Sequence, residues 1–112
     1  MTVIHVVQFQ FGELVPIEDV KSICESMLAL RDNCIHPTSN KAYIKSIVGG
    51  LDNSPEGMQD GITHVFVVEF ESADDRNYYV DKDPAHRAFV EKAGPSILKA
   101  RVVDFTPGVF IV

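Results

Sequence analysis

The side chains best suited to proton transfer in this sequence are His86 and the neighbouring pair Tyr78 and Tyr79. Asp83 is a good helix N-cap and Pro84 favours the first helical position, so a helix is expected to begin here with His86 in its first turn. Apolar residues three, four and seven positions after this histidine share its side of the helix, namely Phe89, Val90 and Ala93. The imidazole is therefore expected to face the protein interior.

The expected surroundings of His86 favour the uncharged form of its ring. Burial disfavours an imidazolium ion, and so does the positive end of a helix dipole. A neutral ring can accept a proton near neutral pH, so His86 is a candidate general base. The alternative is a core histidine whose two nitrogens are satisfied by local hydrogen bonds.

The elements that would position these residues follow from periodicity. Every second residue over 3–11, starting at Val3, is apolar except His5, and residues 62–71 repeat this pattern with His64 as the exception. The other expected elements are a helix over 16–31, a strand over 42–48 ended by Gly49-Gly50, a helix over 73–80 begun by Ser72, the His86 helix, and a strand over 97–105. A polar loop over 52–61 joins the two middle strands.

The order of these elements is β-α-β-β-α-β, which is typical of an α+β, ferredoxin-like fold with a four-stranded antiparallel sheet. We expect one domain spanning residues 1–112, with the helices on one face of the sheet. The opposite face would carry Ile4, Val6, Val65 and Val67, an apolar patch typical of an interface. A homodimer joined through the sheet faces is therefore predicted.

Charge and cysteine content exclude several classes of partner. The formal net charge is −6 and no Lys/Arg cluster is present, which argues against nucleic acid or an anionic membrane. Cys24 and Cys34 fit neither a zinc signature nor a disulfide framework and are expected to be free thiols. The first residues lack a signal-peptide pattern and no stretch is long enough to span a membrane, so a cytoplasmic location is expected.

His5 and His64 are not expected to form a metal site with His86. Both lie near the starts of antiparallel neighbouring strands, which places them at opposite ends of the sheet. At about 3.3 Å per residue, an offset of about five residues separates the rings by well over ~10 Å. His64 is interpreted as a core histidine, with a catalytic role as the alternative, and His36 as a surface residue before Pro37.

Short motifs are distributed over nearly the whole chain: Val3-x-His5, Gly61-x-Thr63-His64, Phe70-Glu71-Ser72, Pro84-Ala85-His86 with Phe89, and Val103-Asp104-Phe105-Thr106-Pro107. In their order and spacing the chain resembles the stress-responsive A/B barrel family. These are small dimeric α+β barrels that include polyketide cyclases of the olivetolic acid type. Other members have no known reaction, so the resemblance supports the fold more strongly than the chemistry.

The resemblance implies a particular set of site residues. In the cyclase branch, the histidine matching His86 and a tyrosine on the preceding short helix form the catalytic pair, and the histidine matching His5 lines the same pocket. One extra residue separates the tyrosine from the histidine here, so Tyr79 is chosen while Tyr78 stays possible. Met27 stands where that cyclase has a pocket tyrosine.

These observations together predict a pocket with a polar end and an apolar wall. The catalytic residues would be His86, Tyr79 and His5, and the substrate-binding residues would be Val7, Phe9, Ile23, Met27, Phe66, Val68, Tyr78 and Phe89. A neutral histidine can deprotonate a carbon between two carbonyls while a tyrosine hydroxyl stabilises the enolate, without a metal or other cofactor.

The predicted function is cyclisation or isomerisation of a polyketide-like β-dicarbonyl compound. One alternative is a non-catalytic, stress-related protein that binds small apolar ligands. Another is a cofactor-free oxygenase, as in related α+β barrels. For the two tyrosines, the alternative is that one caps the core with its hydroxyl at the rim while the other lies on the surface.

Overall fold

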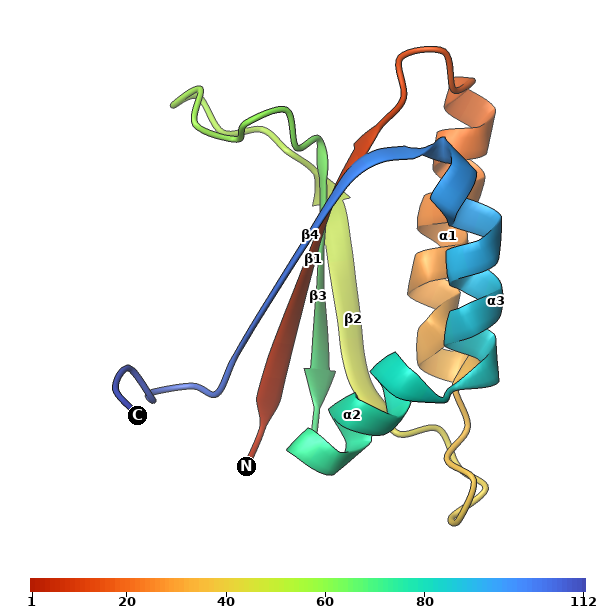
Figure 1. The fold of residues 1–112 in the computed structure, drawn as a ribbon, viewed down its shortest axis with the longest axis vertical. Coiled ribbons are helices and arrows are strands. Elements are labelled where there is room, and N and C mark those ends of the chain that lie inside the picture. Colours follow the sequence, from red (N-terminus) through yellow and green to blue (C-terminus); the bar gives the residue numbers. More distant parts are fainter.

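One antiparallel sheet, with helices covering only one of its faces, makes up the whole structure (Figure 1). The computed structural model describes residues 1–112. Its elements are β1 (Val3–Phe11), α1 (Ile17–Asn33), β2 (Ile44–Leu51), β3 (His64–Phe70), α2 (Ala73–Asp81), α3 (Pro84–Ala93), a short 3-10 turn (Gly94–Ser96) and β4 (Ile97–Phe105). No helix is long and apolar enough to cross a membrane.

The strands lie in the order β2-β3-β1-β4, and every neighbouring pair is antiparallel. This confirms the ferredoxin-like α+β fold with a four-stranded antiparallel sheet. In the register of the sheet, His5 of the central strand β1 lies opposite Val68 of β3 and Asp104 of β4. The last strand thus brings a carboxylate next to the first histidine.

The hydrophobic core lies between the sheet and the helices. Alternate residues of β1 are buried, as the period-two pattern predicts, and α1 buries Ile23, Met27 and Leu30 against them. The core cluster is made of Val7, Phe9, Ile23, Met27, Leu30, Cys34, Ile44, Phe66, Val68, Phe70, Tyr79, Phe89 and Ala93. This packing fixes β1 and α3 relative to each other, which is what the site requires.

The strand β2 differs from its prediction because it runs through Gly49 and Gly50 instead of ending before them. A side chain at Gly49 would meet the Phe66 ring, since a Cβ there would lie 2.3 Å from its Cδ1. The glycine therefore permits close approach within the sheet and does not end the strand. The third strand is also shorter than predicted, because residues 62 and 63 lie before it and residue 71 after it.

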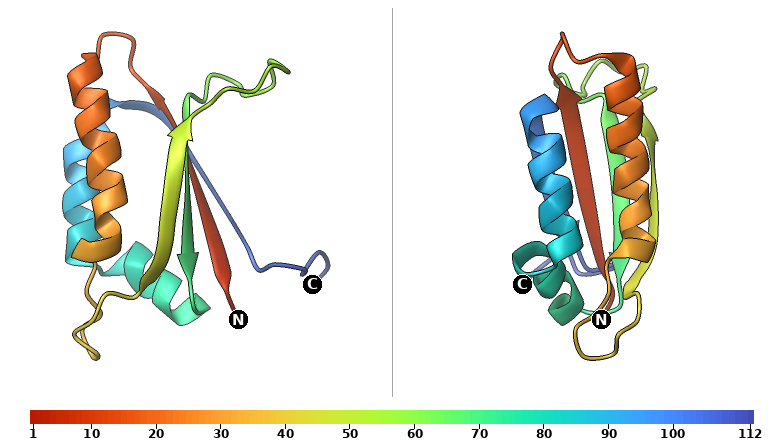
Figure 2. Two further views of the ribbon diagram at one scale, coloured as in Figure 1. Left: turned by 180° about the vertical axis from the view of Figure 1, so that it is seen from behind. Right: turned by 90° about the vertical axis from the view of Figure 1, so that its right-hand side faces the viewer.

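The other face of the sheet carries no helix, as the two views in Figure 2 show. We call this the outer face and define it by its apolar members: Ile4, Val6, Val48, Val65, Val67, Val103 and Phe105. Val48, Val103 and Phe105 are 63%, 55% and 50% exposed. After β4 the chain leaves on this uncovered side (Figure 1).

Candidate active site

A cavity of about 820 Å³ lies between the sheet and the pair α2 and α3. Its lining residues come from β1, α1, α2, α3, the 3-10 turn and β4, with none from β2 or β3. Val80, Val90 and Val102 on its wall are 45%, 50% and 54% exposed. The cavity therefore opens to solvent between α2 and α3 on one side and the edge strand β4 on the other.

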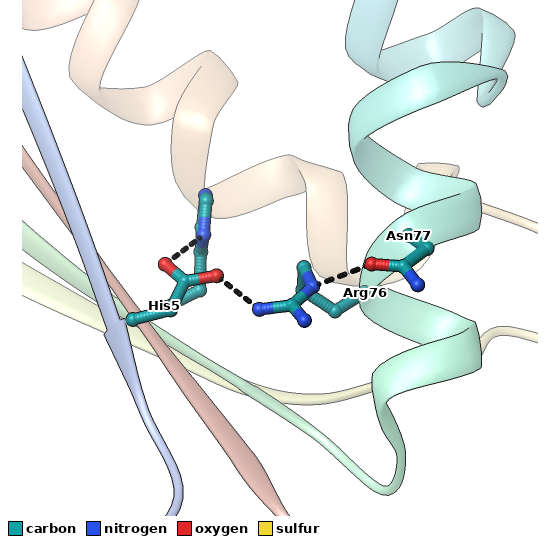
Figure 3. Close-up of polar contacts among 4 residues, drawn as sticks. His5, Arg76 and Asn77 are labelled. Carbon is teal, nitrogen blue, oxygen red and sulfur yellow. Dashed lines mark hydrogen bonds and ion pairs between the residues drawn. The ribbon is translucent and has the colours of Figure 1, made fainter. Parts of the chain in front are cut away.

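One end of the cavity is polar and held by a hydrogen-bonded chain (Figure 3). His5 Nδ1 lies 2.7 Å from Asp104 Oδ1, and Arg76 Nη1 donates to Asp104 Oδ2 at 2.6 Å. Arg76 Nε also donates to Asn77 Oδ1 at 2.8 Å. Because Asp104 accepts the Nδ1 proton of His5, the Nε2 atom of that ring is left for a ligand.

The Tyr79 ring packs near both histidines of the cavity. Its ring centroid is 4.1 Å from that of His86 and 5.7 Å from that of His5. The side chain is 1% exposed, and burial raises the pKa of Tyr79 far above its ordinary value. Its hydroxyl therefore stays protonated at any pH of interest and can act as a hydrogen-bond donor.

His86 is a partly buried residue that lines the cavity. Its Nδ1 atom is enclosed and unpaired, so Nε2 is the nitrogen that can meet a ligand. Burial lowers the pKa of His86, the nearby His5 lowers it further, and a Tyr79 backbone carbonyl and the charge of Asp83 act in the opposite direction. The ring is therefore neutral at pH 7 and can accept a proton.

The position of His86 is set by the start of α3. Asp83 Oδ1 accepts the backbone N–H of Ala85 at 2.8 Å and that of His86 at 3.2 Å, and Pro84 occupies the first turn. The second carboxylate oxygen accepts the Tyr43 hydroxyl at 2.5 Å. Asp83 is completely buried, so this cap anchors α3 to the segment before β2 as well as starting the helix.

Seven of the side chains predicted for the site line the cavity: His5, Val7, Phe9, Met27, Tyr79, His86 and Phe89. Three others, Ile23, Phe66 and Val68, do not, and this corrects the predicted wall. Phe66 and Val68 lie in the packed core because β3 is on the β2 side of β1, whereas the cavity is on the β4 side. Ile23 of α1 is packed in the same core. The prediction placed both central strands along one wall, and only β1 is there.

The predicted substrate-binding role of Tyr78 is also corrected, because this side chain lies outside the cavity. Its ring centroid is 5.5 Å from that of His36 and 5.7 Å from that of Tyr43. Successive helical residues point about 100° apart, so only one of the two adjacent tyrosines can face the cavity. His36, predicted at the surface, is instead partly buried in this aromatic cluster.

His64 lies at the opposite end of the sheet from His5, in register with Phe9. Its Nδ1 is 2.8 Å from the Thr63 hydroxyl, and its ring packs edge-on against Phe11. It is partly buried and does not line the cavity. No group of three or more His, Cys, Asp or Glu side chains is arranged to hold a metal ion.

The sequence interpretation missed the acidic and basic partners at the polar end. Asp104 and Arg76 line the cavity and bind each other, yet neither was selected as a site residue. The alternation of the last strand carried a signal for Asp104, since it is the one charged residue on the same side as Ala100 and Val102. To predict Arg76 as a site residue, one would need to know how α2 lies against β4, and periodicity does not give this.

Comparisons with known proteins agree with this architecture. A protein-family model described as "Stress responsive A/B Barrel Domain" matches residues 3–107. Among curated proteins, none matches the chain. Solved structures do match, and the three below span nearly all of both chains.

A protein from Arabidopsis thaliana is 29% identical, with a TM-score of 0.82, covering 98% of this chain and 99% of the other. A hydroxynitrile lyase from Passiflora edulis is 20% identical, with a TM-score of 0.80 and coverage of 98% and 97%. A dimeric ferredoxin-like protein of unknown function from Thermobifida fusca is 19% identical, with a TM-score of 0.72 and coverage of 94% and 90%. The last two likenesses show the fold alone.

Proposed function

This chain belongs to the stress-responsive A/B barrel family, and we propose that its cavity cyclises or isomerises a polyketide-like β-dicarbonyl compound by cofactor-free acid/base chemistry. The proposal rests on one observation: the neutral ring of His86 packs against the phenol ring of Tyr79 at the wall of a largely apolar cavity. A base and a hydrogen-bond donor side by side are the parts that enolate formation needs.

Three polar atoms support this chemistry. His5, Tyr79 and His86 all line the cavity, and His5 Nε2, the Tyr79 hydroxyl and His86 Nε2 make no hydrogen bond to another side chain. Each can therefore bind an oxygen or a proton of a ligand that reaches it.

The proposed reaction begins with proton abstraction. His86 Nε2 takes a proton from the carbon between two carbonyls, and the Tyr79 hydroxyl donates a hydrogen bond to the enolate oxygen. In a cyclisation, the enolate carbon then forms a bond to a second carbonyl carbon as that C=O π bond breaks. The new alkoxide takes the proton back from the imidazolium, so charge and atoms balance, and loss of water can follow. Asp104 holds the His5 ring in one orientation, with the Nε2 atom able to accept a hydrogen bond from an enol hydroxyl of the substrate.

The apolar remainder of the cavity contributes by positioning. Val7, Phe9, Phe89 and Val102 wall the space beyond the polar end. An apolar wall of this kind excludes water from a linear polyketone and folds it so that the two reacting carbons meet. Such positioning can contribute several orders of magnitude to the rate without any further group.

A homodimer in the cytoplasm is part of the same proposal. The outer face is apolar and bears no helix, and an exposed apolar surface of this kind marks an interface. The structurally similar Thermobifida fusca protein is described as dimeric. Two outer faces packed against each other would form the dimeric α+β barrel that the sequence predicts.

The function is tested with a linear tri- or tetraketide thioester, with products followed by mass spectrometry. The expected product differs from its substrate only by loss of water or thiol, with no oxygen consumed. His86→Ala is expected to lower the rate by about 10²–10⁴-fold, and Tyr79→Phe by at least about 10-fold. Tyr78→Phe is the matched control, because this tyrosine lies outside the cavity.

The same variants separate catalysis from binding. A catalytic site loses rate in His86→Ala while the affinity for an unreactive diketone, measured by calorimetry, stays within a few-fold. If wild type binds the diketone but converts no polyketide, and His86→Ala binds equally well, the cavity is a ligand-binding site and the proposed reaction is wrong.

A further inference from the structure

The C-terminal tail, Val109–Val112, is apolar and uncovered. Phe110 and Ile111 are 93% and 88% exposed, and Val109 is 50% exposed. A turn closed by the Val109 N–H on the Thr106 carbonyl, with Gly108 at φ +82°, separates the tail from β4. The tail also lies beyond residues 3–107, the part of the chain that the family model describes.

Leaving this tail in water is unfavourable for a folded protein. A buried Phe alone removes about 150–250 Å² from water, and the largest exposed apolar patch of a typical monomer is only about 300–600 Å². The tail follows Val103 and Phe105 of the outer face after the turn over residues 106–109. Tail and outer face are therefore both apolar and uncovered, on the same side of the sheet.

The direction in which the turn sends the tail limits which surface can cover the tail. In Figures 1 and 2 the tail projects away from its own sheet, on the side that bears no helix. Its side chains are too exposed to be packed on their own outer face. In a dimer joined through the outer faces, the partner subunit lies on that same side.

We infer that the tail of each protomer packs against the outer face of the partner subunit and carries a large part of the dimer's stability. This inference rests on the dimer in the proposed function and adds a specific segment to it. The side chains of Val109–Val112 are all uncharged, so their docking depends on apolar contact. Buried aromatic anchors contribute most to the stability of an interface, and Phe110 is the aromatic side chain of the tail.

The inference is tested by measuring the dimer dissociation constant by analytical ultracentrifugation. A chain ending at Gly108 and the double variant Phe110→Ser, Ile111→Ser are both expected to dissociate at least about 100-fold more readily than the full chain. Leu14→Ser is the matched control, because Leu14 is 97% exposed and lies before α1, away from the tail. The control is expected to stay within about threefold of the full chain.

A photo-crosslinking amino acid at position 110 locates the docking surface. Crosslinks from one subunit to peptides of the partner's β1, β3 or β4 are expected. Crosslinks within one chain only, or a truncated chain that dimerises as tightly as the full chain, would overturn the inference while leaving a dimer in place. A monomeric full chain would overturn both the tail inference and the dimer. Polyketide turnover by the truncated chain reports on the cavity separately from either result.

Discussion

Replacing Asp83 by Ala should destabilise the protein more than the loss of an ordinary helix cap, because this buried carboxylate accepts hydrogen bonds from three groups. Loss of an N-cap costs about 1 kcal/mol. The Tyr43 hydroxyl would also lose a charge-assisted partner, and an unpaired buried hydroxyl costs about 1–3 kcal/mol. The sum is about 3 kcal/mol, which lowers Tm by roughly 10 °C in a domain of this size.

The assay is urea unfolding followed by circular dichroism, with Ser72→Ala as the comparison. Ser72 caps α2 through one hydrogen bond, from the Asp75 N–H at 3.1 Å, so this variant should lose only about 1 kcal/mol. Asp83→Asn keeps an oxygen for the cap and should lose about 1–2 kcal/mol, the part due to charge. An Asp83→Ala protein no less stable than Ser72→Ala would refute the reasoning that this carboxylate anchors α3 and with it His86.

Three further predictions concern the sheet, the base and the cavity wall. Gly49→Ala should cost about 2–3 kcal/mol in urea unfolding because its Cβ would overlap Phe66, whereas Gly50→Ala, with nothing within 4 Å, should stay within about 0.5 kcal/mol. Because the folded pKa of His86 is below its unfolded value of about 6.5, the unfolded chain binds more protons and stability should fall as pH drops below ~6.5. A smaller loss of stability at low pH in His86→Gln would confirm this, and a loss equal to that of wild type would contradict it. Ala100→Phe should narrow the cavity and weaken diketone binding by at least about 10-fold in calorimetry, with unchanged affinity as the contrary result.

The fold could be predicted from periodicity because most of its elements have a clear apolar side. The alternation in β1 and the cap at Asp83 fixed where His5 and His86 point, and both side chains line the cavity. Ile23 and Phe66 have the same apolar character as true wall residues. Which of them faces open space depends on where helices diverge from the sheet, and that is a tertiary property. Tyr78 and Tyr79 could not be separated for a similar reason, since α2 is strongly polar and offers almost no apolar stripe.

Alkylation of the two free thiols, Cys24 and Cys34, can report local opening of the folded chain. Cys34 is completely buried, and burial together with the charge of Asp83 raises the pKa of its thiol well above the ordinary value. Cys24 is only partly buried, so it should react with an alkylating reagent first. Because the thiolate is the reactive form, Cys34 can be alkylated only when the end of α1 separates from the start of α3. The labelling rate of Cys34, followed by mass spectrometry, therefore measures how often the start of α3, which positions His86, separates from α1.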